Sequence, residues 1–292
     1  MKKKFLISLC ACVMAAVSLI GLAGCKTFDA DKNISVLTRE DGSGTKSAFM
    51  EIIGLKGKKD VSGIIVATST QAVLAEVKSN PLAIAFDSLG YVTDEVKKLT
   101  VNGVEATAEN IKSGDYKISR PLSIVYKEEN LTEADKAFKK FLESRDAADI
   151  ITNNGYVVSR SETETYVKTK ASGSVTLTGS TSLKPLMEKL ATAFESIEKA
   201  ISVSVGAGGS GTGYNDAKNN VSSFGMISET FDPAKAEGCV SEVVALDGIA
   251  VIVNKDNPLN DISVEDLKNI YDIDAGDNAV KVWKQLTEKT EQ

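Results

Sequence analysis

The sequence predicts an α/β fold with mostly parallel sheets, because short β-rich runs alternate with helical patterns along most of the chain. Between these runs, apolar residues recur at helical spacing, most clearly over 185–199. Thr132 with Asp135, and Ser263 with Asp266, have the spacing of capping boxes at the starts of two further helices. The β-rich runs are 34–38, 63–68, 82–86, 122–126, 174–179, 201–206 and 248–254.

The first 24 residues predict an export signal that is removed from the mature protein. Three lysines precede an apolar run over 5–22, which ends in the sequence LAGC, whose cysteine is Cys25. Small residues before a cysteine are typical of a lipobox, so we expect lipid on Cys25 and a cell-membrane location on the extracytoplasmic face. Residues 25–33 would then be a tether. The alternative is an uncleaved membrane anchor, because about 20 apolar residues can span a bilayer.

The composition excludes several classes of function. The chain of 292 residues has a net charge of −6, and loss of the three signal lysines would make it −9. An acidic chain with few aromatic residues is a poor nucleic-acid binder, so we expect no nucleic-acid partner. Histidine is absent, which removes histidine-based catalytic triads and metal sites, and we expect neither a metal nor a cofactor. Only Cys239 lies beyond residue 25, which excludes a disulfide framework and leaves a buried apolar residue or a reactive thiol.

Four turns rich in small residues lie at the ends of predicted strands. The tetrapeptide GSGT occurs twice, within 39–54 and within 205–217, and the other two turns are 179–182 and 224–229. A turn between a strand and a helix exposes consecutive backbone N–H groups and the positive end of the helix, which suits an anion. One such loop is usually a plain turn, but several at strand ends favour a shared anion site.

Arg39 is the one fixed positive charge beside such a loop. A guanidinium offers paired N–H donors that match two oxygens of an oxyanion. The alternative is a surface arginine that pairs with Glu40 or Asp41. Because the chain is acidic overall, an anion site here depends on local geometry to overcome an unfavourable field.

Several segments together resemble the signature segments of phosphate-binding proteins that serve the phosphate ABC transporter. They are TGSTSLKPL, GGSGTGY, FGMIS, DGIAVIVNKDNPL, IYD and REDGSGTKSAF, and the resemblance extends from about Ile34 to Trp283. In that family, two α/β lobes joined by hinge strands close over one dehydrated phosphate, which is the type II periplasmic-binding-protein fold. The resemblance therefore implies a binding protein, not an enzyme, with phosphate in the cleft between its lobes and permease subunits as partners.

The same resemblance implies the residues of the phosphate site. Asp41 is expected to hold Arg39 in place, and Asp41 or Glu229 to accept the hydrogen bond of the phosphate proton. Ser228 stands where many relatives have an aspartate or a serine. The full set expected at the phosphate is Arg39, Asp41, Ser43, Gly44, Thr45, Thr181, Ser182, Ser210, Gly211 and Ser228.

The segment order differs from the usual order of the family and is interpreted as a circular permutation. The GSTS loop usually precedes the RxDGSGT loop, whereas here the loop at 39–45 comes first. The polar stretch 159–172 would then link the usual ends of the chain, a change that folds tolerate when the old termini are close. With crossover strands at 121–126 and 248–254, we expect two lobes. The lobe with the REDGSGT loop is 34–119 plus 253–292, and the continuous lobe with the GSTS and GGSGT loops is 120–252.

Four other functions remain open. The pattern G-x-G-x-x-G over 206–211 matches a dinucleotide fingerprint, with Glu229 near the place of the ribose-binding acid. Ser43 and Lys46 match the S-x-x-K pattern of serine acyltransferases, although the other two strings of that class are absent. Within binding proteins, the ligand could instead be another oxyanion, or the chain could be a surface sensor.

Overall fold

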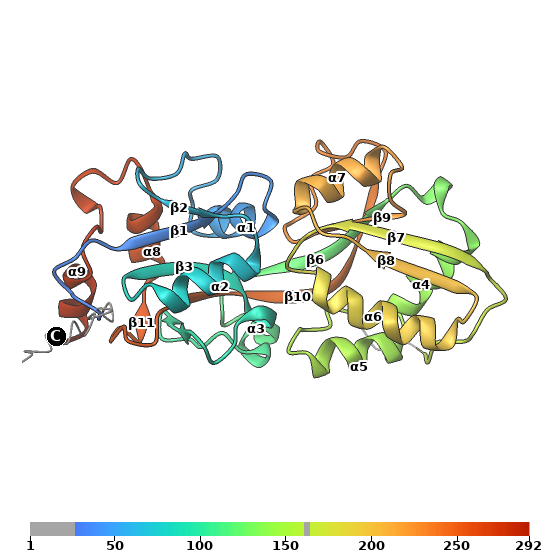
Figure 1. The fold of residues 1–292 in the computed structure, drawn as a ribbon, viewed down its shortest axis with the longest axis horizontal. Coiled ribbons are helices and arrows are strands. Elements are labelled where there is room, and N and C mark those ends of the chain that lie inside the picture. The colour runs from blue at the N-terminus through green and yellow to red at the C-terminus, as the bar shows by residue number, and fades with distance from the viewer. Residues whose placement is uncertain (1–26, 161–163, 292) are drawn as a thin grey trace, which may run out of the picture.

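The computed structural model describes residues 27–160 and 164–291 (Figure 1). The expected signal peptide and Cys25 lie outside the described residues. The strands are β1 (Ser35–Arg39), β2 (Ile65–Ala67), β3 (Ala83–Ser88), β4 (Lys97–Lys98), β5 (Thr100–Val101), β6 (Ser119–Tyr126), β7 (Gly173–Gly179), β8 (Ile201–Val205), β9 (Phe224–Ile227), β10 (Val240–Val253) and β11 (Asp261–Ile262). The α-helices are α1 (Gly44–Ile52), α2 (Thr70–Ser79), α3 (Ala108–Ser113), α4 (Glu133–Leu142), α5 (Arg145–Asn153), α6 (Lys184–Ile197), α7 (Ser210–Lys218), α8 (Val264–Tyr271) and α9 (Lys284–Thr287).

One nine-stranded sheet runs through the described part of the molecule. Its order is β2-β1-β3-β10-β6-β9-β7-β8, with β4 paired to β10, while β5 and β11 form a small second sheet. β1 is parallel to β2 and β3, and β7 is parallel to β8 and β9. In the centre, β10 is antiparallel to β3 and β6, and β6 is antiparallel to β9. The α/β fold expected from the sequence is confirmed, with parallel strands at both ends of the sheet and an antiparallel centre.

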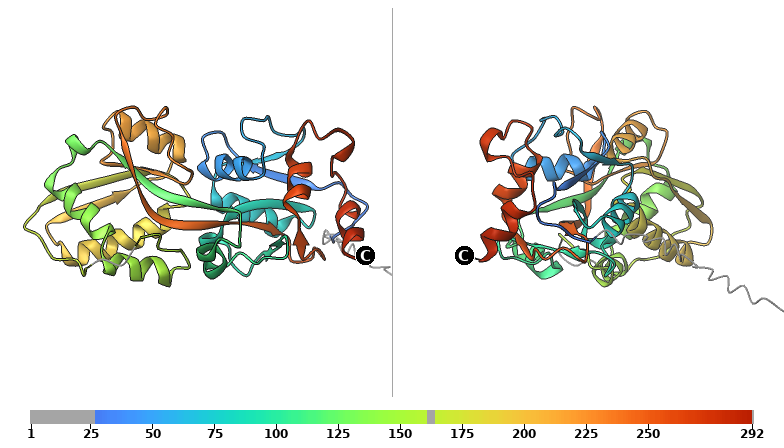
Figure 2. Two further views of the ribbon diagram at one scale, coloured as in Figure 1. Left: turned by 180° about the vertical axis from the view of Figure 1, so that it is seen from behind. Right: turned by 60° about the vertical axis from the view of Figure 1, so that its left-hand side comes forward.

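The two central strands connect two separate hydrophobic cores. Figures 1 and 2 show β6 and β10 running side by side from one half of the molecule to the other. Buried apolar residues of 34–118 and 249–286 form one core, and most of those of 122–245 form the other. A smaller third cluster in the second half contains Val125, Tyr214, Ala217, Ile227 and Ala236. Val157, which pairs with Leu246 on β10, also joins the first core. We call the two halves the first lobe and the second lobe.

Local sequence signals mark the starts of two helices. Thr132 and Asp135 form the expected capping box at the start of α4, where each side chain bonds the backbone N–H of the other. The Ser263 hydroxyl accepts from the Asp266 N–H at the start of α8. Such caps satisfy N–H groups that have no partner inside the helix.

The C-terminal helices pack against the beginning of the described chain. On α8, the Tyr271 hydroxyl donates to the Leu37 carbonyl of β1 at 2.9 Å. The Trp283 ring meets the Phe28 ring edge-on, with 5.6 Å between centroids. Part of the expected tether, residues 28–33, is therefore bound to the C-terminal segment.

The polar stretch expected to be a linker is docked on the second lobe. Its described residues, 159–160 and 164–172, contain no helix or strand. Tyr166 is buried against the rings of Phe141 and Phe194. The carboxylate of Glu198 accepts hydrogen bonds from the Tyr166 hydroxyl at 2.9 Å and from the Thr169 hydroxyl at 2.9 Å. Although the stretch is polar, the buried ring of Tyr166 anchors it to the second lobe.

Candidate functional site

Four helices begin at one place between the lobes. α1 and α2 follow β1 and β2 in the first lobe, and α6 and α7 follow β7 and β8 in the second. Gly44 at the start of α1 lies against Ser210 at the start of α7. Thr70 at the start of α2 lies 3.4 Å from the hydroxyl of Ser182, just before α6. Helix starts carry partial positive charge and unpaired N–H groups, so their convergence at the carboxyl ends of parallel strands favours an anion.

The Arg39 side chain lies among these helix starts and is 1% exposed. Its Nε and Nη2 donate to the two carboxylate oxygens of Glu40 at 2.9 and 2.8 Å. Nη1 donates to the Thr70 hydroxyl at 3.3 Å, and Nη2 donates across the cleft to the Thr181 hydroxyl at 3.1 Å. Arg39 therefore pairs with Glu40 but is not a surface arginine, and its guanidinium contacts both lobes.

Asp41 does not hold Arg39, so that expectation is wrong. The Asp41 side chain is 99% exposed, and its carboxylate pairs with Lys46 at 2.9 Å, which lowers the pKa of Asp41 below its ordinary value. The chain turns at Asp41, which directs its side chain to solvent, while Glu40 remains beside the strand end. Glu229, the other expected proton acceptor, is buried and pairs with Lys235 at 2.7 Å.

Hydroxyl groups of both lobes meet across the cleft. The Thr45 and Ser182 hydroxyl oxygens are 2.9 Å apart. The Thr70 hydroxyl lies 3.3 Å from that of Thr181 and 3.4 Å from that of Ser182. Because a hydroxyl both donates and accepts, this cluster can turn its donors toward the oxygens of a tetrahedral anion.

The two GSGT loops approach closely. The N–H of Gly211 in the second lobe donates to the Gly42 carbonyl in the first at 3.0 Å. A Cβ placed on Gly44 would lie 2.2 Å from the Ser210 Oγ and 2.7 Å from the Ser228 Oγ. The hydroxyl oxygens of Ser210 and Ser228 are 3.3 Å apart, and both residues are buried. Only glycine at position 44 permits this approach.

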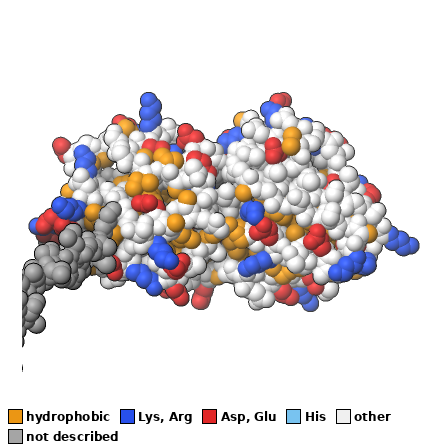
Figure 3. Space-filling model, in the orientation of Figure 1, with side chains coloured by type: hydrophobic (Ala, Val, Ile, Leu, Met, Phe, Trp, Pro, Cys, Tyr) orange, Lys and Arg blue, Asp and Glu red, His pale blue; other side chains and the backbone are white. Residues whose placement is uncertain are grey.

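A cavity of about 360 Å³ lies at the mouth of the cleft. Residues of both lobes line it, including Ser43, whose hydroxyl also accepts from the Lys46 N–H as the N-cap of α1. Its lysines, at positions 46, 56, 58 and 235, all have acidic partners. On the face shown in Figure 3, acidic and basic side chains are interspersed. The mouth therefore has no surplus of positive charge, so an anion would be attracted by Arg39 and the helix starts inside the cleft.

Asp87, which the sequence analysis did not single out, is a fully buried acid at the end of β3. One carboxylate oxygen accepts from the Ser88 N–H at 2.8 Å, and the other has no hydrogen-bond partner. Burial raises the pKa of Asp87 well above its ordinary value, although Arg39 and Arg120 act in the opposite direction. A carboxyl in this environment favours its protonated form.

Asp87→Asn is expected to stabilise the fold increasingly as the pH rises. Above pH about 4, the unfolded chain releases the Asp87 proton while the folded chain retains it, so the wild type loses stability up to the raised pKa of Asp87. An asparagine has no proton to release and avoids this loss. Urea unfolding of the wild type and of Asp87→Asn from pH 4 to pH 9 should show a difference in the free energy of unfolding that is absent in acid and grows with pH. Asp94→Asn, at an exposed site, is the control. A difference independent of pH would contradict the assignment.

Two further residues at the site, Thr70 and Tyr91, were not expected from the sequence, whereas Glu40 was named as a possible partner of Arg39. Thr70 stands at a further strand-to-helix turn, in the run VATSTQAV, so the signal that led to the other loops was present there. The Tyr91 hydroxyl donates to the Thr181 carbonyl of the other lobe at 2.9 Å. Nothing in the sequence around Tyr91 indicates a contact across the cleft.

Within residues 27–160 and 164–291, no group of acidic and cysteine side chains is arranged to hold a metal ion. The same ranges contain no helix that is long and apolar enough to cross a bilayer. The donors gathered between the lobes are a guanidinium, hydroxyls and helix starts, and this set suits an oxyanion and not a metal.

The chain is similar to known binding proteins over most of its length. Residues 26–145 and 164–291 match the model of the PBP superfamily domain, so the chain belongs to this superfamily of binding proteins. Phosphate-binding protein PstS 2 of Streptococcus agalactiae is 36% identical over 93% of this chain and 96% of its own. Phosphate-binding protein PstS 2 of Streptococcus pneumoniae is 32% identical over the same shares.

Structural comparison agrees with this placement. The crystal structure of a phosphate-binding protein of a phosphate ABC transporter from S. pneumoniae matches with a TM-score of 0.70 at 32% identity, covering 87% of this chain and 99% of that one. The phosphate-binding protein PstS of Bacillus subtilis is 33% identical, but over only 42% of this chain and 40% of its own. The family is a substrate-binding component of transporters and not an enzyme, so the dinucleotide and acyltransferase interpretations are wrong.

Proposed function

We propose that the protein captures inorganic phosphate between its two lobes and delivers it to an ABC permease. The observation that carries this proposal is the buried guanidinium of Arg39, which contacts both lobes where four helices begin. Phosphate needs many donors on all sides once it leaves water, and this set supplies them without a metal. The nine remaining expected residues, without Asp41, are the proposed phosphate contacts: Arg39, Ser43, Gly44, Thr45, Thr181, Ser182, Ser210, Gly211 and Ser228.

The proposal places the protein on the extracytoplasmic face of the cell membrane. Cleavage of residues 1–24 and lipid on Cys25 supply the anchor, supported by the LAGC sequence. The first described residues lie beside Trp283 of the first lobe. A lipid anchor would therefore hold the lobe that contains Arg39 close to the membrane.

We further propose that the segments are circularly permuted relative to other PstS proteins. One alignment covers 93% of the chain against the streptococcal relatives, which implies that they share this order. The alignment with the B. subtilis protein covers only 42% of the chain. This is expected if two segments have exchanged order, because one alignment can then follow only one of them. The two main cores support a discontinuous lobe with the REDGSGT loop and a continuous lobe with the GSTS and GGSGT loops, with 159–172 as the connecting segment. The change of lobe on β10 falls before residue 249 and not after residue 252 as expected from the sequence, because Ile249–Ile252 pack in the first core.

Calorimetric titration of residues 26–292 with phosphate tests the function. We expect one site per chain, and no displacement of phosphate by sulfate at a similar concentration. Sulfate that competes equally would favour the alternative of a general oxyanion-binding protein or sensor. Absence of phosphate binding would overturn the proposal.

Thr70→Val is expected to weaken phosphate binding about tenfold. The valine keeps the shape of the buried side chain but removes a hydroxyl that contacts Arg39, Thr181 and Ser182. One hydrogen bond to a charged group such as Arg39 is worth about 1.5 kcal/mol or more. Thr70→Ser, which keeps the hydroxyl, is the matched control and should bind more tightly than the valine variant. Equal affinities for wild type and Thr70→Val would remove Thr70 from the site.

A further inference from the structure

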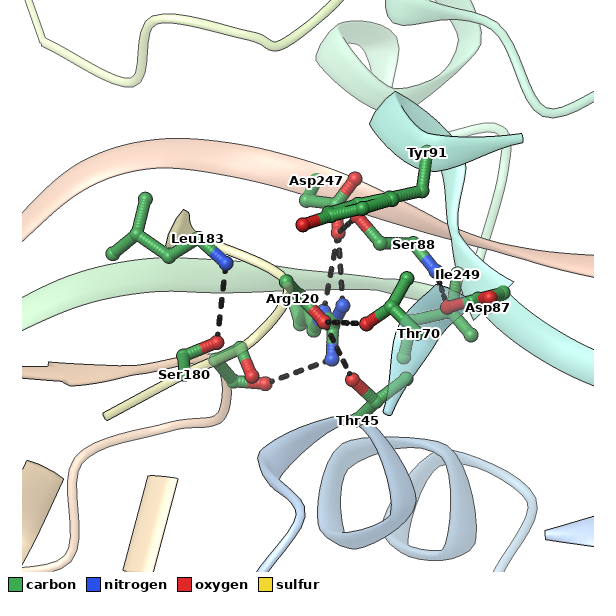
Figure 4. A network of polar contacts seen from close by, with 12 residues as sticks. Thr45, Thr70, Asp87, Ser88, Tyr91, Arg120, Ser180, Leu183, Asp247 and Ile249 are labelled. Carbon is green, nitrogen blue, oxygen red and sulfur yellow. Dashed lines mark hydrogen bonds and ion pairs between the residues drawn. The ribbon is translucent and has the colours of Figure 1, made fainter. Parts of the chain in front are cut away.

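A buried ion pair joins the two crossover strands directly behind the proposed phosphate site. Arg120 on β6 and Asp247 on β10 lie opposite each other in the antiparallel ladder, and each is 2% exposed. The Arg120 Nε and Nη2 donate to the same oxygen of Asp247 at 3.3 and 3.0 Å. Figure 4 shows this pair beside Thr45 and Thr70, whose hydroxyls belong to the cluster in the cleft.

One arm of the network reaches the second lobe through Arg120. The remaining Nη1 of Arg120 donates to the Ser228 carbonyl at 3.1 Å. On its other side, the Ser228 residue faces the cleft, where its N–H donates to the Ser210 hydroxyl at 3.1 Å. Because a peptide group is rigid, fixing the Ser228 carbonyl limits where the neighbouring backbone and the Ser228 hydroxyl can point.

The other arm passes through the first lobe and returns to the cleft. The Ser88 hydroxyl at the end of β3 donates to Asp247 at 2.7 Å. The short 3₁₀ turn Leu89–Tyr91 follows immediately, and the Tyr91 hydroxyl donates to the Thr181 carbonyl at 2.9 Å. Both arms therefore end on carbonyls of residues whose hydroxyls are proposed to bind phosphate.

The geometry requires a guanidinium. Arg120 uses three nitrogens in different directions, two toward Asp247 and one toward Ser228. A lysine ammonium keeps the charge but cannot hold all three directions at once. Burying two charges is expensive, and replacing such a pair by apolar side chains is often neutral for stability, so stability alone is a poor reason for this pair.

We propose that Arg120 and Asp247 are positioning residues for phosphate binding. Their hydrogen bonds, on the hinge-strand side of the cleft, hold the turns that contain Ser228 and Thr181 in the closed arrangement. Neither side chain is assigned a contact with phosphate. The inference rests on the proposed function and adds to it the link between the hinge strands and the ligand-binding turns. In this arrangement, the hinge strands determine how well two turns of the second lobe face Arg39.

The test uses Arg120→Lys and Asp247→Asn in residues 26–292, with phosphate titration, stopped-flow phosphate release and urea unfolding without phosphate. Both variants are expected to lose about tenfold or more in affinity, mainly through faster release. Tyr91→Phe, which leaves the buried pair intact, should lose about threefold through the second arm alone. Tyr91→Phe therefore tests the positioning role even if Arg120→Lys and Asp247→Asn fold poorly.

Arg160→Lys is the matched control. Arg160 is partly buried and donates to the carbonyls of Leu142 and Val243 in the second lobe. Arg160 also forms an ion pair with Glu242, which is not among the proposed phosphate contacts. Arg160→Lys should lower stability without changing phosphate affinity. A wild type that binds phosphate, together with Arg120→Lys, Asp247→Asn and Tyr91→Phe variants that bind it within twofold, would overturn the positioning role. A wild type that binds no phosphate would overturn the proposed function and this inference with it.

Discussion

Arg39→Ala is expected to weaken phosphate binding by roughly two to three orders of magnitude. Truncating one partner of a buried, hydrogen-bonded charge pair costs about 2–5 kcal/mol. Here the loss removes donors to Thr70 and Thr181 and leaves the Glu40 carboxylate without its partner at 2.8 Å, beside the bound anion. Calorimetric titration of the variant measures the loss directly.

Thr181→Val is the control for this prediction. It removes the hydroxyl that accepts from Arg39 at 3.1 Å but leaves the guanidinium and Glu40 in place. One hydrogen bond to a charged group is worth about 1.5 kcal/mol or more, so we expect about a tenfold loss. Equal and small losses for Arg39→Ala and Thr181→Val would show that Arg39 is not the main phosphate contact.

Gly44→Ala is expected to weaken phosphate binding by about 10- to 100-fold while leaving the stability of the free protein nearly unchanged. The added methyl group would lie 2.2 Å from the Ser210 Oγ and 2.7 Å from the Ser228 Oγ, and these atoms belong to the other lobe. Overpacking of this kind costs about 1–3 kcal/mol. The lobes can separate to relieve it, so the cost falls on closure and not on folding.

Gly213→Ala provides the matched comparison. Its methyl group would lie 2.3 Å from the Met226 carbonyl oxygen, inside the second lobe, where separation of the lobes brings no relief. We therefore expect Gly213→Ala to lower the free energy of unfolding, measured in urea, more than Gly44→Ala does. If Gly44→Ala binds phosphate as tightly as the wild type, the closed contact between the two GSGT loops is not part of the bound state.

Much of the fold was predictable because its signals are local. A β-rich run followed by small residues and an amphipathic helix indicates a strand-to-helix turn wherever it occurs, and those turns are where α1, α6 and α7 begin. The capping box of Thr132 and Asp135 depends on residues three apart, and the structure confirms it. Arg39 was identifiable because it stands where a predicted strand runs into a Gly/Ser loop.

The partners of these residues were decided by tertiary structure. Asp41 and Glu40 are adjacent in sequence, and only the direction of the turn determines that Glu40 pairs with Arg39 while Asp41 reaches solvent. The ion pair of Arg120 with Asp247 joins positions 127 apart, and it depends on the register of β6 against β10. The sequence alone determined which segments form strands, turns and helix starts, since those follow from neighbouring residues. Which side chains meet was decided by how the two lobes pack around the crossover strands, because hydrogen bonds depend on distance and direction in space.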